Sequence, residues 1–236
     1  MDKYRSLHLW MFIPMIVMQL GIYHDYWGDF SENAWSVHIH YWTGTIWYIY
    51  LIIQPYFATH KQMSKHRTNG IIGMFIAGAV CITALAMMHR DIVSSEQSLA
   101  HPERFGPFQP WFFFGIAAVE IVMMAAFGYA VIMSIVKRKQ LEDHSWWLIS
   151  TVFIIMMPAL GRGIGNLWQQ AGSIMYPLYL STAIIVMLLY LGAWKYKKLG
   201  HPATWLALAV NVINCFLEPI GRSEAVQSFL KAMIKG

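Results

Sequence analysis

The sequence has little charge and almost no cysteine. Of its 236 residues, 12% are charged, which is about half the fraction found in soluble domains. The low charge, together with 57% hydrophobic residues, excludes an intrinsically disordered chain, which requires low hydrophobicity and high net charge. The two cysteines, Cys81 and Cys215, stand in apolar segments, so no disulfide framework and no paired-thiol metal motif is present.

What the chain has in quantity is long apolar runs. Each is close to the length that a helix needs to cross about 30 Å of hydrocarbon, and backbone groups in lipid must be paired within such a helix. The sequence therefore predicts an all-α, polytopic membrane protein with a single domain over 1–236. The expected spans are seven: Leu7–Tyr23, Trp35–Tyr56, Gly70–Met88, Pro110–Val136, Trp146–Trp168, Ile174–Trp194 and Pro202–Phe216.

The basic residues follow the connections between these runs. Eleven of the 17 precede the first run or lie in the second, fourth and sixth loops: Lys3, Arg5, Lys61, Lys65, Arg67, Lys137, Arg138, Lys139, Lys195, Lys197 and Lys198. The positive-inside rule then predicts a cytoplasmic N-terminus and an external C-terminus in a bacterial inner membrane. The net charge of +5 thus reflects topology, and we expect no nucleic acid partner. The lipid bilayer is the expected partner, with a second copy or another membrane subunit left open, and 222–236 is expected to form a short interfacial helix.

Two charged residues fall inside the runs. Glu120 stands near the middle of the fourth run and Arg162 in the outer half of the fifth. An intramembrane charge is costly unless it faces the bundle interior, which makes both residues functional candidates. A helix-locking ion pair and a protonated glutamate are the structural alternatives. The glycines at 161, 163 and 165 permit close approach of another helix or of a ligand, and Pro158 interrupts the helix just before them.

Ten histidines cluster at the ends of the runs. His40 and His89 lie at the same depth in an antiparallel pair, and Asp25 in the first loop can add an oxygen ligand. His66 and His144 are the candidates at the cytoplasmic face. Imidazole is a common ligand of haem iron, zinc and copper, although interfacial histidines also act as simple membrane anchors.

A series of short motifs runs from the second expected span to the fifth. They are His40, Gln54-Pro55, His66-Arg67-Thr68-Asn69-Gly70, His144-x-Trp146-Trp147-Leu148, Pro158-Ala159 and Arg162. This series resembles a bacterial family of predicted membrane proteins, domain of unknown function 2306. The resemblance covers roughly residues 36–165 and implies a multi-helix membrane architecture without implying a reaction. It makes His40, His66, His144 and Arg162 the residues of interest.

Three functional hypotheses follow. The first is a protein that binds haem b or a metal for electron transfer, with His40, His89, His66 and His144 as ligands and Arg162 pairing an anionic group. The second is a zinc-dependent lipid hydrolase, which needs three ligands and an open coordination position. The third is a non-enzymatic proton or anion transporter, or an assembly subunit, that uses Glu120 and Arg162.

Overall fold

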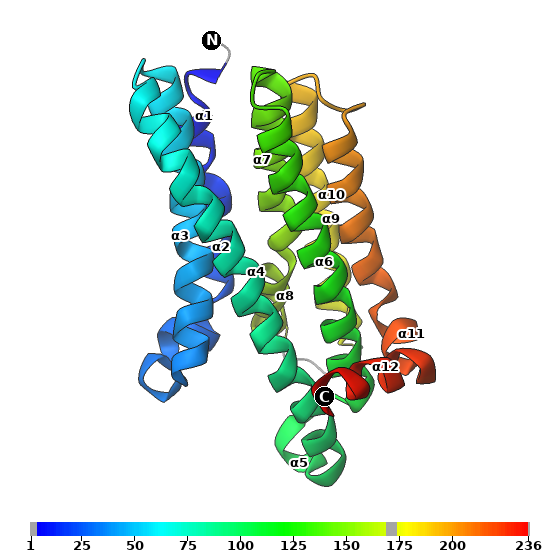
Figure 1. Cartoon of the computed structure of the whole chain (residues 1–236). Helices are drawn as coiled ribbons and strands as arrows, with labels where there is room; N and C mark the ends of the chain where they lie inside the picture. Colours follow the sequence, from blue (N-terminus) through cyan, green and yellow to red (C-terminus); the bar gives the residue numbers. More distant parts are fainter. Residues whose placement is uncertain (1–3, 169–173, 236) are drawn as a thin grey trace.

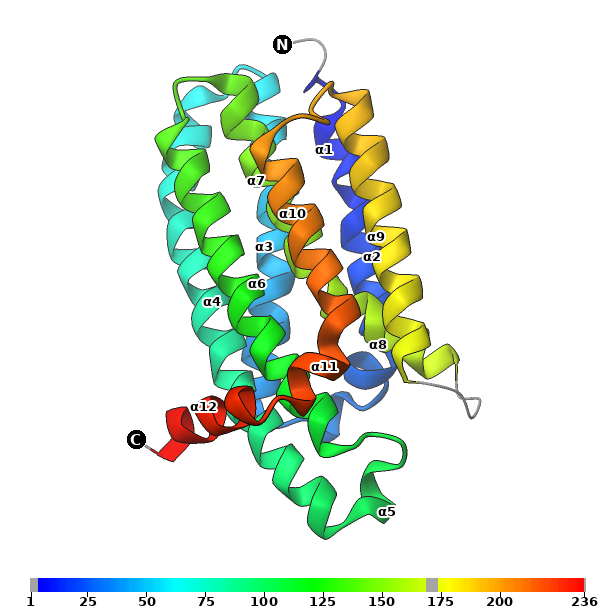
Figure 2. The same ribbon diagram turned by 90° about the vertical axis from the view of Figure 1, so that its right-hand side faces the viewer.

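The computed structural model describes residues 4–168 and 174–235; Lys3, from the N-terminal basic group, lies outside these ranges. Within the described residues the chain is all-helical and has no strand. The long helices run side by side in one bundle (Figures 1 and 2). The α-helices are α1 (Leu7–Trp10), α2 (Phe12–Gly21), α3 (Trp35–Thr59), α4 (Met63–Ala100), α5 (Pro102–Phe105), α6 (Pro110–Val136), α7 (Leu141–Ile155), α8 (Met157–Leu167), α9 (Met175–Lys195), α10 (Pro202–Ile213), α11 (Leu217–Arg222) and α12 (Glu224–Lys235). A π-helical turn spans Tyr23–Gly28, and 3-10 turns span Phe30–Glu32 and Asn214–Phe216.

Five of these helical stretches are long and apolar enough to cross a membrane: α4, α6, α7 with α8, α9, and α10 with α11. Their outward faces carry large apolar side chains, such as Phe75 (75% exposed) and Ile82 (70% exposed). Such an exposed apolar surface is typical of contact with lipid. The chain is therefore a multi-pass membrane protein. The apolar stretch Leu7–Gly21 is shorter, and α3, whose 25 residues include polar ones, is not among the five.

The expected span Gly70–Met88 is the central part of a much longer helix. α4 begins at Met63 and ends at Ala100. The apolar run shows only which part of the helix lies in the hydrocarbon. The helix itself continues until a residue interrupts it, and the first proline after this run is Pro102. The prediction was thus right about the span and wrong about where the helix ends.

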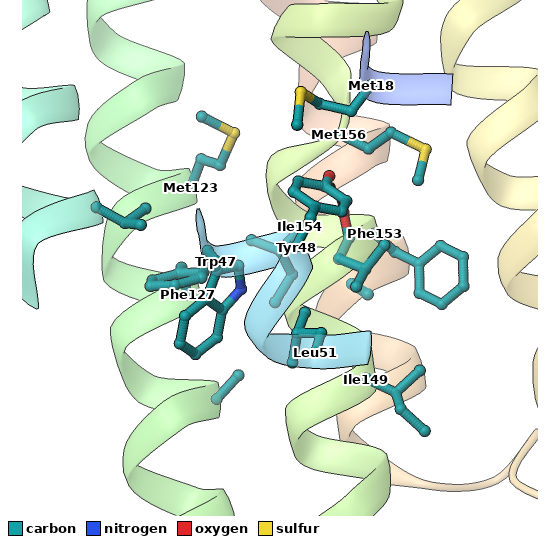
Figure 3. Packing of buried hydrophobic residues seen from close by; sticks show 14 of the residues in the cluster. Met18, Trp47, Tyr48, Leu51, Met123, Phe127, Ile149, Phe153, Ile154 and Met156 are labelled. Atoms are coloured by element: carbon teal, nitrogen blue, oxygen red, sulfur yellow. Dashed lines mark hydrogen bonds between the residues drawn. The ribbon is translucent and has the colours of Figure 1, made fainter. Parts of the chain in front are cut away.

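The interior of the bundle is an apolar core to which most of the long helices contribute, α3, α4, α6, α7, α9 and α10 among them. Trp47, Phe127, Ile154 and Met156 are buried there (Figure 3). The indole Nε1 of Trp47 donates a hydrogen bond to the Thr151 hydroxyl at 3.2 Å, so the polar edge of this buried ring has a partner, as buried polar groups require.

Helix α8 approaches α2 unusually closely. A Cβ atom on Gly163 would lie 2.7 Å from the Gly21 Cα atom, and one on Gly21 would overlap the Ala159 carbonyl oxygen. Two facing glycines thus let the two backbones touch. The expected break before this segment is present, because the α7 helix ends at Ile155 and Pro158 lies in the first turn of α8.

The two ends of the bundle differ in charge. The first described residues, from Tyr4, and the loops 60–62, 137–140 and 196–201 lie at one end, which we name the basic end (Figures 1 and 2). At the opposite end α12 lies across α4 and α6 (Figure 2). Leu230 of α12 is fully buried against Ile92 and Phe114, so this helix is docked on the bundle.

Candidate functional site: a half-buried charge cluster

Arg162 is the centre of a polar cluster near the end of the bundle opposite the basic end. The proline break and the Gly21–Gly163 contact position its helix, α8, against the first part of the chain. Its guanidinium group donates a hydrogen bond to the Tyr41 hydroxyl of α3, and the guanidinium carbon lies 5.9 Å from the centre of the Tyr41 ring. The ring and hydroxyl of Tyr41 together provide a cation–π contact and a hydrogen bond for a half-buried cation.

Three carboxyl groups from three different segments lie near this guanidinium. Asp91 of α4, Glu120 of α6 and Asp25 of the turn Tyr23–Gly28 are all close enough for their charges to interact with that of Arg162. Asp91 is 7% exposed. Its carboxylate lies 4.0 Å from the Arg90 guanidinium, so a second cation belongs to the cluster.

The carboxyl groups differ in their hydrogen-bond partners. The Asn166 amide, one turn after Arg162 on α8, donates to the Asp25 carboxylate at 2.5 Å. Over residues 4–168 and 174–235, no group donates a hydrogen bond to Glu120 and no cation lies within salt-bridge distance of it. Glu120 therefore has charged neighbours (Asp91, Arg162 and Arg90) without a bonded partner.

His40 lies beside the same cluster. It is half-buried and close enough to Arg162 and Arg90 to interact with their charges. Its Nδ1 atom is buried and has no hydrogen-bond partner among the described residues. The charged neighbours of His40 are thus the two cations Arg162 and Arg90, whereas those of Glu120 also include the carboxyl group of Asp91.

Tyr26, in the turn Tyr23–Gly28, lies at the edge of the charge cluster beside Tyr41. Its hydroxyl lies 3.0 Å from the Nδ1 atom of His38, and its ring lies 4.5 Å from that of Tyr41. Burial raises the pKa of the Tyr26 phenol, so this hydroxyl stays protonated at neutral pH. His38 and His40 point to different surroundings, as expected for residues two positions apart on a helix.

The structure brings together some of the predicted site residues. Glu120, Arg162, His40 and Asp25 converge as described. His89, the predicted partner of His40, has an exposed side chain on α4 and takes no part in the interactions above. Sequence reasoning missed Asp91 and Tyr41. Asp91 lies beyond the expected span Gly70–Met88, and the absence of any helix breaker between residues 89 and 100 is the signal that it continues the helix.

His66 and His144 lie at the basic end, far from the charge cluster. Their ring centres are 6.2 Å apart, and the Nδ1 atom of His144 donates to the Ser134 carbonyl at 2.7 Å. In the described part of the chain, no three histidine, cysteine, aspartate or glutamate side chains form a group that could hold a metal ion. Binding of haem b, zinc or copper stays a prediction.

Comparisons with known proteins found no relative of this chain. No family model matches the sequence, and no curated protein and no solved structure is similar to it. The resemblance to domain of unknown function 2306 stays a prediction.

Proposed function

We propose that this chain is a non-enzymatic, proton-handling membrane protein that binds and releases a proton at Glu120, as a proton transporter or as a subunit that passes protons. The observation that carries the proposal is the composition of the charge cluster. Two guanidinium groups, Arg90 and Arg162, interact with three carboxyl groups, Asp25, Asp91 and Glu120. The cluster therefore has one carboxyl group more than it has permanent cations.

Within a membrane, an uncompensated charge costs several kcal/mol, so the excess carboxyl group favours a bound proton. Asp25 has the Asn166 amide and Asp91 has Arg90. Glu120 is the carboxyl group without such a partner. Because the cluster is acidic overall, it attracts a proton and repels an anion, which favours proton handling over anion handling.

The proposal includes seven spans, with α1–α2 and α3 as the first two. The length of α3, 25 residues, corresponds to about 37 Å, which is enough to cross the hydrocarbon. The gathering of the basic loops at one end supports a cytoplasmic basic end in a bacterial inner membrane. The charge cluster then lies in the outer half of the bundle.

The test is proton binding and flux with the full chain and a conservative variant. We expect infrared difference spectra between acidic and alkaline pH to show a carboxylic-acid band that disappears in Glu120→Gln. The control Glu96→Gln changes an exposed acid on α4 and should retain the band. In liposomes loaded with a pH-sensitive dye, the wild-type chain should admit protons faster than Glu120→Gln. Identical spectra and identical flux for the wild type and Glu120→Gln would overturn the proposal.

Haem or metal binding through His40, His89, His66 and His144 is the competing proposal. A visible absorption spectrum of the purified protein, with metal analysis of the same sample, distinguishes the two. A haem band, or one equivalent of zinc or copper, would favour a redox or hydrolytic function over simple proton handling.

A further inference from the structure

A second polar site lies near the basic end, between the N-terminal segment, α3, α4 and α7. It is a cavity of about 50 Å³, several times the roughly 10–15 Å³ that a single water needs. Apolar side chains such as Leu7, Leu51 and Leu148 form much of its wall. We name it the Gln54 cavity.

Gln54 gives the cavity an unsatisfied polar group. Its side chain lines the cavity and is 1% exposed, yet neither its amide oxygen nor its amide nitrogen has a hydrogen-bond partner in the described part of the chain. A buried amide without partners costs folding free energy. Such a group in a protein interior requires an explanation, and a bound molecule in the cavity supplies one.

The imidazole rings of His66 and His144 add hydrogen-bonding groups to the same cavity wall. Because the Ser134 carbonyl can only accept, the Nδ1 atom of His144 carries the proton of that bond and its Nε2 atom is left as an acceptor. The Nδ1 atom of His66 is buried and has no partner among the described residues. The cavity thus offers donors and acceptors from Gln54, His66 and His144.

The side chains of the cavity wall indicate which class of ligand fits the cavity. No carboxylate, ammonium or guanidinium group lines the cavity within the described residues, so a charged ligand would be left without a counterion. A mostly apolar wall with a few convergent hydrogen-bonding groups is the usual form of a site for a small organic molecule.

We propose that the Gln54 cavity binds the oxygen-bearing ring of a neutral, lipid-soluble molecule of the quinone or quinol class. The Gln54 amide nitrogen donates to a ring oxygen, and the Gln54 amide oxygen and His144 accept from a ring hydroxyl in the reduced form. The apolar wall contacts the ring. This site is separate from Glu120 and does not rest on the proton-handling proposal.

The experiment is equilibrium binding of a decyl-substituted benzoquinone to the full-length protein in detergent micelles. We expect saturable binding of one molecule per chain and a rise in the thermal denaturation midpoint with ligand concentration. Gln54→Met keeps the side-chain volume but removes the amide, and should weaken binding at least tenfold. Gln97→Met, an exposed glutamine on α4, is the matched control and should bind as the wild type does.

Two further measurements separate loss of the site from loss of the fold. The ligand-free Gln54→Met protein should denature at a temperature no lower than that of the wild type, because the change removes an unpartnered amide. Ser145→Leu, which places a larger side chain in the cavity wall, should also abolish binding. Absence of saturable binding to the wild type, or unchanged affinity in Gln54→Met, would overturn the proposal.

Discussion

The contact between α2 and α8 makes a sharp test of how the charge cluster is positioned. The change is Gly163→Ala, which adds one methyl group to α8. That methyl carbon would lie 2.7 Å from the Gly21 Cα atom, 3.1 Å from its carbonyl oxygen and 3.3 Å from its carbonyl carbon. All three atoms are backbone, so none can rotate out of the way, and the two helices must move apart.

The expected cost follows from these distances. Overpacking a tight contact costs about 1–3 kcal/mol, and replacing glycine by alanine within a helix returns about 0.5–1 kcal/mol. At the middle of these ranges the net expectation is a loss of about 1 kcal/mol in the free energy of unfolding. For a chain of this length that corresponds to a fall of about 2–4 °C in the denaturation midpoint.

Gly165→Ala is the matched control on the same helix. A Cβ atom at Gly165 meets nothing within 4 Å, so this variant should be neutral or slightly stabilised. The assay is thermal denaturation of both variants and the wild type in the same detergent. Equal midpoints for the two variants, or a stabilised Gly163→Ala, would refute the close approach of α2 and α8 and with it the basis for the position of Arg162.

Two further predictions concern the ends of the bundle. His201 caps α10, because its Nδ1 atom accepts from the Ala203 N–H at 3.1 Å, and burial lowers the pKa of His201 from its ordinary value of 6.5. The unfolded chain therefore binds this proton more readily than the folded chain, so stability is full above pH 6.5 and falls as the pH drops below it. His201→Asn keeps a capping oxygen and should flatten this part of the pH–stability curve; an unchanged curve would contradict the assignment. Leu230→Ala should release α12 from the bundle, at a cost of about 2–5 kcal/mol, and speed proteolysis of the C-terminus. Phe229→Ala, which changes a 59% exposed side chain, should not, and equal cleavage of both variants would show that α12 is not held through Leu230.

The sequence could predict the class of fold because lipid leaves the backbone few choices. Apolar runs must form helices, and a proline followed by alternating glycines marks a break and a close approach. The break at Pro158 is confirmed. Of the three glycines in α8, however, only Gly163 meets another backbone, whereas Gly165 faces open space. Spacing alone could not distinguish them, because the partner, Gly21, lies far away in the sequence.

The candidate site was predictable only in part. Glu120 and Arg162 attract attention because a charge inside an apolar run is costly. Asp91 is equally important in the cluster but stands beyond the apolar part of its run, where an acid is ordinary. Its place beside Glu120 follows from the continuation of α4 to Ala100, which no hydropathy pattern marks.

The two proposed sites are separated by a largely apolar layer of the bundle. Along α3, Tyr41 of the charge cluster and Gln54 of the cavity are 13 residues apart in the sequence, which corresponds to about 20 Å. Between them lies the core around Trp47 and Phe127 (Figure 3), where the hydrogen bonds of Trp47 to Thr151 and of Tyr48 to the Val152 carbonyl are isolated pairs and do not form a continuous chain for a proton. A proton bound at Glu120 therefore cannot reach the Gln54 cavity through this layer without water entering it. The geometry accordingly predicts independent sites, in which Glu120→Gln leaves quinone binding unchanged and Gln54→Met leaves the carboxylic-acid band unchanged. Coupling between the two variants would instead require a second conformation in which this apolar layer opens.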